Sequence, residues 1–199
     1  MTGRNRSRLL TLAIGSAPWL AFFALLLAGW RVANLTGALP AYGDVLEVVW
    51  TTVWYDGALR GMHGFLVHPS TFFPAGWHVA TFAGGPAMFL PLLPLHWLGG
   101  PAFAYNVTTL LTFALAFAGT KRLARRFLGA LPAAVAALLF TFWGFRWLRI
   151  AGHLNISLAS ALLPWLALSI ERAFDAEHRK VAWWVLAGVL WAAMIACSW

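Results

Sequence analysis

The side chains best suited to chemistry are gathered in residues 31–85. The chain has only six Asp and Glu residues, and three of them, Asp44, Glu47 and Asp56, lie in this stretch. Histidines, among them His68, are also concentrated there. A carboxylate can accept a proton from an attacking hydroxyl, and carboxylates and imidazoles can hold a metal ion or meet a phosphate. We therefore predict that residues 31–85 hold the functional site.

Asp44 and Glu47 are three residues apart, so on a helix they share a face. One interpretation is structural: Asp44 is the N-cap of a helix and Glu47 completes a capping box. The other is chemical: Asp44 is a catalytic base, and Glu47 supports it or binds a divalent metal ion. Leu46, Trp50 and Trp54 follow at four-residue spacing and predict an apolar face that lies on a membrane surface.

A second polar group follows a long apolar run and contains Arg146, Arg149, His153 and Asn155. The planar guanidinium of arginine suits bidentate recognition of phosphate. Arginines next to an apolar run also extend their charged ends to lipid headgroups without any specific ligand. Both interpretations of Arg146 and Arg149 stay open, and all four residues are candidate substrate-binding groups.

Two further candidates for substrate binding, His68 and Arg60, lie within residues 31–85. His68 begins a proline- and aromatic-rich stretch, which either forms a wall of the site or is an ordered loop packed on the bilayer. The histidines do not show the four-residue helical spacing of a zinc motif. A divalent metal ion is the one cofactor that the residues suggest.

The composition is that of a membrane protein. Of the 199 residues, 61% are hydrophobic and 10% are charged, whereas soluble domains carry about 25% charge. The net charge of +8 does not indicate nucleic-acid binding, because the basic residues lie in short clusters between apolar runs. The single cysteine, Cys197, excludes a disulfide framework within the chain.

Apolar runs of about the length needed to cross a bilayer predict five spans. If the proline-rich segment 86–98 does not cross, ten basic residues face the cytoplasm and four face outward. If it does cross, five face inward and nine outward. The first arrangement obeys the positive-inside rule, so segment 86–98 is predicted to be re-entrant or interfacial. The predicted spans are about 9–30, 103–120, 131–148, 156–170 and 181–199.

The expected fold is therefore an all-α, polytopic membrane helix bundle, with residues 1–199 forming one domain. Its amino terminus is cytoplasmic. An extracytoplasmic loop, residues 31–100, carries interfacial helices after the first span.

Short motifs spaced along this architecture resemble those of a known superfamily. They include a loop opening with Gly43 and Asp44, then a stretch from His68 to Gly76 containing Pro69 and Pro74. Further motifs are Pro101 with Tyr105 and Asn106, Gly152 with His153 and Asn155, and Leu163 with Pro164. The chain is similar to the amino-terminal half of integral-membrane glycosyltransferases of the GT-C superfamily.

This resemblance implies transfer of a sugar from a polyprenyl-phosphate carrier to an acceptor at the extracytoplasmic face of the cell membrane. It places Asp44 as the catalytic residue, with Glu47 in support. It implies as partners the carrier-linked sugar donor and membrane lipid, and no nucleic acid. Because superfamily members are much longer, we expect the chain to be a fragment. The alternatives are a non-catalytic membrane protein, either a transport component or a carrier-binding subunit, and an inactive truncated relative.

Overall fold

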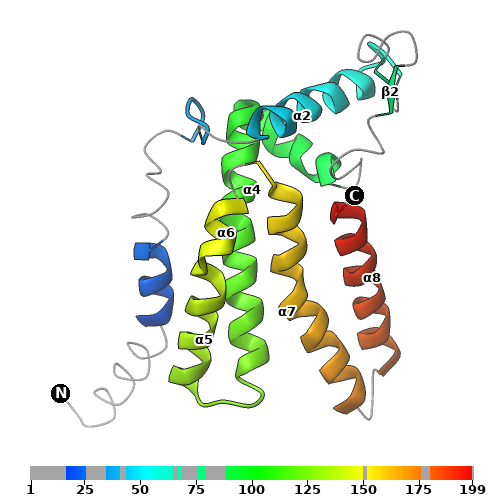
Figure 1. Ribbon diagram of the computed structural model, residues 1–199. Helices are drawn as coiled ribbons and strands as arrows, with labels where there is room; N and C mark the ends of the chain where they lie inside the picture. Colours follow the sequence, from blue (N-terminus) through cyan, green and yellow to red (C-terminus); the bar gives the residue numbers. More distant parts are fainter. Residues whose placement is uncertain are drawn as a thin grey trace, which may run out of the picture.

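The chain folds into an all-helical bundle with a helical layer across one end, as seen in a computed structural model (Figure 1). The structure describes residues 17–25, 35–40, 44–64, 67–68, 76–78, 88–149, 152–175 and 180–198. Residues 17–25 are helical. The labelled helices that follow are α2 (Val45–Leu59), η3 (Leu90–Leu92), α4 (Leu93–Ala124), α5 (Ala130–Phe142), α6 (Gly144–Arg149), α7 (Leu154–Asp175) and α8 (Lys180–Ser198). Two strands, β1 (Val67–His68) and β2 (Trp77–His78), pair antiparallel, with Val67 opposite His78.

Four stretches are long and apolar enough to cross a membrane: Leu93–Ala124, Ala130–Arg149, Leu154–Asp175 and Lys180–Cys197. They contain the last four predicted spans almost entirely, so the prediction of an all-α protein with several membrane helices is confirmed. Most of the predicted first span, residues 9–30, lies outside the described residues. Which ends of the bundle face the cytoplasm stays a prediction.

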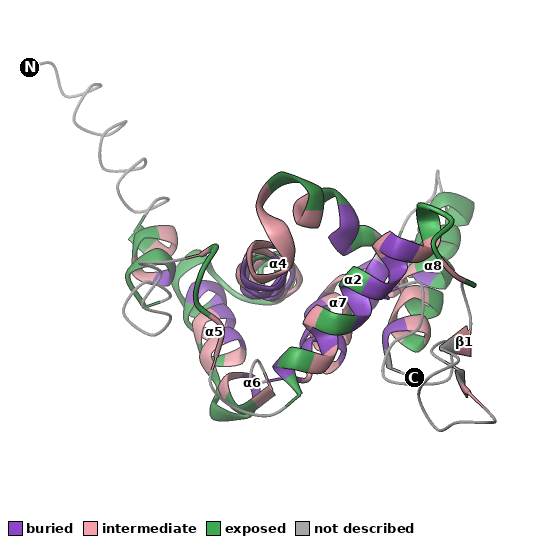
Figure 2. Cartoon of the chain, turned by 90° about the horizontal axis from the view of Figure 1, so that it is seen from above, coloured by how far each residue is buried: buried purple, intermediate pink, exposed green. Residues whose placement is uncertain are grey.

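A kink at Gly100 divides α4 into a short arm and a long membrane helix. Gly100 has φ 85° and ψ 175°, and Pro101 follows it. Proline excludes the preceding residue from the helical region, and glycine adopts positive φ without the strain of a side chain. The arm, residues 93–99, runs across the end of the bundle before the helix turns down through it (Figures 1 and 2). Most of segment 86–98 belongs to this arm and to the turn before it. Its place at a membrane surface stays a prediction.

Helix α2 lies across the same end of the bundle (Figures 1 and 2). Its buried face includes Val45, Val48, Thr52 and Tyr55, and the Thr52 hydroxyl donates to the carbonyl of Val48. These positions follow the helical period, so one face of α2 meets the bundle. On the predicted membrane-facing stripe, Leu46 and Trp50 are exposed but Trp54 is buried. The four-residue spacing drifts round a helix of 3.6 residues per turn, which brings Trp54 towards the core.

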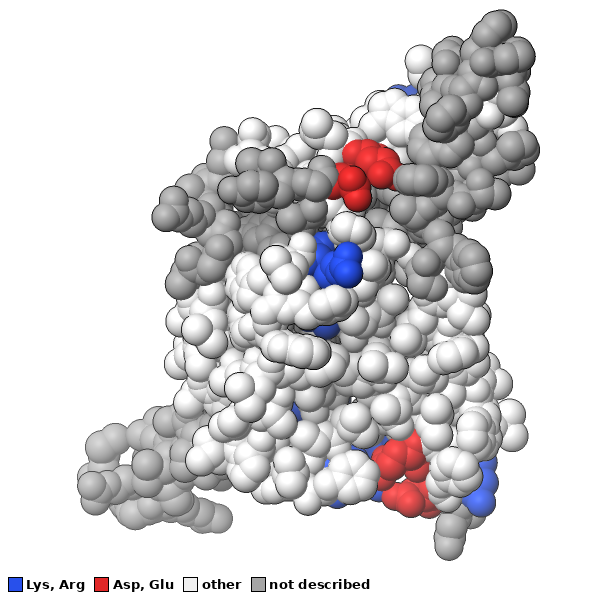
Figure 3. Space-filling model, viewed as in Figure 1, with Lys and Arg blue, Asp and Glu red and all other residues white. Residues whose placement is uncertain are grey.

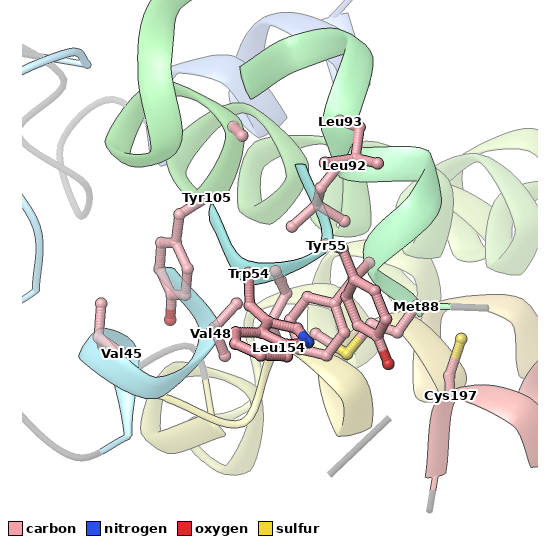
Figure 4. Packing of buried hydrophobic residues seen from close by; sticks show 12 residues of the cluster. Val45, Val48, Trp54, Tyr55, Met88, Leu92, Leu93, Tyr105, Leu154 and Cys197 are labelled. Atoms are coloured by element: carbon pink, nitrogen blue, oxygen red, sulfur yellow. The ribbon is translucent and has the colours of Figure 1, made fainter. Parts of the chain in front are cut away.

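The apolar core beneath α2 joins it to the arm of α4 and to the first turn of α7 and the last of α8. Figure 4 shows part of this cluster, with Tyr105 beside the start of α2 and with Met88 and Cys197 at the other end. A second cluster lies deeper in the bundle, where Phe22 stacks on Phe117 at 4.9 Å. The helical layer that carries Asp44 is therefore fixed to the bundle by hydrophobic packing.

Candidate functional site

The fold brings Asp44 and His153 together at the layered end of the bundle. Asp44 immediately precedes α2, and His153 immediately precedes α7. The Asp44 Oδ2 to His153 Nε2 distance is 3.8 Å, and the two side chains are 58% and 39% exposed. Both groups are thus open to a ligand. Their separation is an ion-pair distance slightly beyond hydrogen-bond reach, and such pairs tighten on ligand binding in many enzymes.

Gly152 makes this approach possible. A Cβ atom placed on Gly152 would lie 2.3 Å from the backbone nitrogen of Asp44 and 2.9 Å from its Cα. Gly152 also has φ 123°, in a region that side chains disfavour. The turn before α7 therefore packs directly on the start of α2, at a distance that only glycine permits.

Two neighbouring residues of α4 hold the segments that meet here. The hydroxyl of buried Tyr105 accepts a hydrogen bond of 3.1 Å from the backbone N–H of Gly152. The side-chain amide of Asn106 donates to the carbonyls of Leu35 and Ala38, both at 2.8 Å. One turn of α4 thus fixes both the chain before α2 and the turn before α7. The sequence analysis named Tyr105 and Asn106 only as motif residues. Two adjacent polar side chains inside an apolar run are the pattern that could have indicated their structural role.

Asp44 occupies the N-cap position that the capping interpretation predicts, but its side chain does not make the predicted capping hydrogen bond. Asp44 is the N-cap residue of α2, and its backbone carbonyl accepts from the N–H of Val48 at 3.2 Å. Its side chain makes no capping hydrogen bond. The carboxylate is directed to His153 instead, so capping does not explain why an aspartate stands here.

Glu47 lies one turn into α2 and is half-buried. Partial burial, and then the nearby charge of Asp44, raise the pKa of the Glu47 carboxyl above its ordinary value. The two predicted carboxylates are therefore electrostatically coupled.

The two arginines of α6 have different surroundings. Arg146 is buried, its Nη1 donates to the carbonyl of Ser157 at 3.0 Å, and its guanidinium lies over the rings of Phe113 and Phe140. It braces α6 against α7, and burial separates it from headgroups. Arg149 is half-buried over the ring of Phe145, and its carbonyl accepts from the N–H of His153 at 2.9 Å.

Figure 3 shows this end of the molecule, with an acidic surface near the start of α2 above a basic surface near α6. Asn155, in the first turn of α7, is buried. Of the candidates on the α6–α7 side, Arg149 and His153 thus remain accessible, and His153 is the one that lies next to Asp44.

Arg60 is not part of this group. It is the C-cap residue of the 15-residue α2, about 24 Å along the helix from Asp44. It pairs with Asp56 at 3.0 Å, and Asp56 also accepts from Trp97 Nε1 at 2.7 Å and lies 3.6 Å from His96 Nε2. The bond from Trp97, then those from Arg60, hold the pKa of the Asp56 carboxyl below its usual range. This cluster ties the far end of α2 to the arm of α4.

The remaining predictions are not placed at the site. His68 belongs to β1, and its side chain lies outside the described residues. In the part of the chain that the structure describes, no three His, Cys, Asp or Glu side chains are grouped to hold a metal ion. The role of a divalent metal ion stays a prediction.

Comparisons with protein-family models, with curated proteins and with solved structures found no match for this chain. The site must therefore be interpreted from its own geometry.

Proposed function

We propose that this chain belongs to a membrane glycosyltransferase that moves a sugar from a polyprenyl-phosphate carrier to an acceptor hydroxyl at the extracytoplasmic face. The observation that carries the proposal is the solvent-accessible pair of Asp44 and His153 at one end of a bundle of apolar helices, with Arg149 one helical turn before His153 in the chain. A base and a cation next to a membrane boundary are the groups that this reaction requires.

In the proposed reaction, the acceptor oxygen attacks the anomeric carbon while the bond from that carbon to the phosphate oxygen breaks. The electron pair of the broken bond leaves with the polyprenyl phosphate, and the acceptor proton passes to the carboxylate of Asp44. His153, 3.8 Å away, orients that carboxylate. Glu47 is the supporting carboxyl, and its raised pKa reflects its partial burial and the nearby charge of Asp44.

Arg149 is the phosphate-binding group in this proposal, and His153 its neighbour. Arginine stabilises the charge that develops on a leaving phosphate, and a donor of this kind contributes most where it is fixed before the reaction. Stacking on Phe145 at 4.9 Å fixes the plane of the Arg149 guanidinium and leaves its edge free to meet oxygen atoms. Arg146 has the supporting role, because its guanidinium is buried.

The proposal is tested with the purified protein in lipid nanodiscs and a panel of radiolabelled undecaprenyl-phosphate sugars, with membrane extract as the source of acceptors. We expect Asp44→Asn to lower transfer about a hundred- to ten-thousandfold. We expect Arg149→Gln to weaken carrier binding about tenfold or more. Arg60→Gln removes the same charge at the far end of α2 and should leave transfer unchanged.

Thermal stability separates this proposal from a structural role of Asp44. Since the side chain makes no capping bond, Asp44→Asn and Asp44→Ala should both melt close to the parent. Transfer by Asp44→Asn at the parental rate would refute the catalytic assignment.

One observation favours the alternative of a non-catalytic transport component. Arg146 is a buried cation inside a candidate span, and ionisable groups in membrane helices mark transport paths in many proteins. Binding of undecaprenyl phosphate without any sugar transfer, in parent and in Asp44→Asn alike, would favour that alternative.

A further inference from the structure

A cavity of about 1060 Å³ opens at the opposite end of the bundle from Asp44. It lies between the last turns of α4 and α7 and the first turns of α8, and Trp19 of the amino-terminal helix also lines it. Five basic side chains surround it: Lys121, Arg122, Arg125, Arg126 and Arg172. Figure 3 shows blue and red surfaces at this lower end. Nothing in the proposed reaction uses this cavity.

Most of this positive charge is not neutralised within the described residues. Arg126 pairs with Glu171 at 2.7 Å and also with Asp175. The other four cations have no ion pair in the described part of the chain. The amino-terminal eight residues carry three arginines and no acid, so that segment does not complement the cavity. A negatively charged ligand would complement the positive charge of the cavity.

Two aromatic rings organise the cations. The Trp165 Nε1 donates to the carbonyl of Leu115 at 2.9 Å, and its ring packs on Gly119, where a Cβ atom would lie 2.6 Å from that nitrogen. Arg122 lies over this fixed ring at 4.9 Å, and Lys121 lies over Trp19 at 5.3 Å. Stacking holds each cation in place and leaves its N–H groups available to oxygen acceptors. Two of the cations at the cavity are thus held in fixed positions by aromatic rings.

The rest of the lining selects the kind of anion. Leu168 and Leu186 form an apolar part of the cavity lining, deeper in the bundle than the basic residues at its rim. The ends of α4 and α7 are where candidate membrane spans end, so the cavity lies at the level expected for headgroups. A soluble anion would leave the apolar wall uncovered, whereas a phospholipid covers it with acyl chain.

We infer that this cavity binds an anionic phospholipid, with its phosphate among Arg122, Arg172 and Lys121 and its acyl chains against Leu168 and Leu186. Basic pockets between membrane helices at the cytoplasmic boundary bind such lipids in other proteins. The positive-inside rule predicts that this end of the bundle, which carries the basic clusters, lies at that boundary.

Native mass spectrometry of the detergent-solubilised full chain tests the inference, with dioleoyl phosphatidylglycerol as probe and dioleoyl phosphatidylcholine as the zwitterionic comparison. We expect phosphatidylglycerol to be retained in preference. The double variant Arg122→Gln with Arg172→Gln should bind it about ten- to a hundredfold more weakly. The matched double variant Arg60→Gln with Lys180→Gln removes two exposed charges that do not line the cavity and should bind it like the parent.

Other outcomes overturn the inference. Equal losses in the two double variants would mean that net charge alone attracts the lipid. Displacement of phosphatidylglycerol by millimolar inorganic phosphate would identify a soluble-anion site, and equal retention of phosphatidylcholine would remove the role of the headgroup charge. If the Arg122 and Arg172 variant does not fold, Arg125→Gln, which changes an exposed side chain on the same rim, replaces it.

Discussion

Replacing Gly152 with alanine should separate the two halves of the candidate site. The new Cβ atom would lie 2.3 Å from the Asp44 nitrogen, whereas ordinary contacts begin at 3.4 Å, so backbone must move by about 1 Å. A positive φ costs a side chain about 1–2 kcal/mol, and overpacking adds about 1–3 kcal/mol. We therefore expect Gly152→Ala to destabilise the protein by about 2–5 kcal/mol.

The chain offers controls that separate these two costs. Gly61 also has positive φ, 73°, but a Cβ atom there would meet nothing within 4 Å. Gly61→Ala should therefore cost only about 1–2 kcal/mol. Gly188 lies in α8 with open space and no positive φ, so Gly188→Ala should leave stability unchanged or raise it by up to about 1 kcal/mol.

The assay is thermal unfolding in one detergent, followed by tryptophan fluorescence, with sugar transfer measured on the same samples. For a chain of this size, each kcal/mol corresponds to roughly 2–4 °C in Tm. The expected order of Tm is Gly188→Ala highest, then Gly61→Ala, then Gly152→Ala, and only the last should also lose transfer. Equal Tm values for Gly152→Ala and Gly61→Ala would refute the close contact between Gly152 and Asp44.

Three further predictions concern the groups around the site. Tyr105→Phe leaves the N–H of Gly152 without its acceptor and should cost about 1–3 kcal/mol in thermal unfolding. Trp97→Phe removes the hydrogen bond that is the main cause of the low pKa of Asp56. In the parent, the stability that comes from this low pKa is present above pH 3.8 and is lost as pH falls through the lowered pKa. We therefore expect the variant to be less stable than the parent by about 1–2 kcal/mol in thermal unfolding at neutral pH. Because the pKa of the Glu47 carboxyl is raised, its contribution to stability is fully present below the ordinary pKa of 4.5 and is lost as pH rises through the raised pKa. Glu47→Gln should therefore have a higher Tm than the parent at neutral pH and the same Tm below pH 4.5. Equal Tm values at every pH would contradict the partial burial of this carboxylate.

The class of protein and most of its helices could be predicted from the residue pattern alone. Long apolar runs with few charges can form only helices in a bilayer, because each backbone polar group must be satisfied within its own segment. The helical spacing of apolar residues after Asp44 likewise predicted α2. The kink that ends the arm of α4 lies at Gly100 and Pro101, two residue types that interrupt helices. These are local effects, so the sequence contains them.

Which polar residues meet depends on how the helices pack against one another. Arg146 and Arg149 are alike in sequence, yet packing of α6 on α7 buries one and leaves the other accessible. Asp44 and Arg60 lie in one predicted loop, yet a straight helix holds them apart. Asp44 and His153 are far apart in the chain, and they meet because Gly152 packs on the start of α2 while Tyr105 bonds the turn. Contacts of this kind depend on how rigid elements dock, which residue spacing along a single chain does not encode.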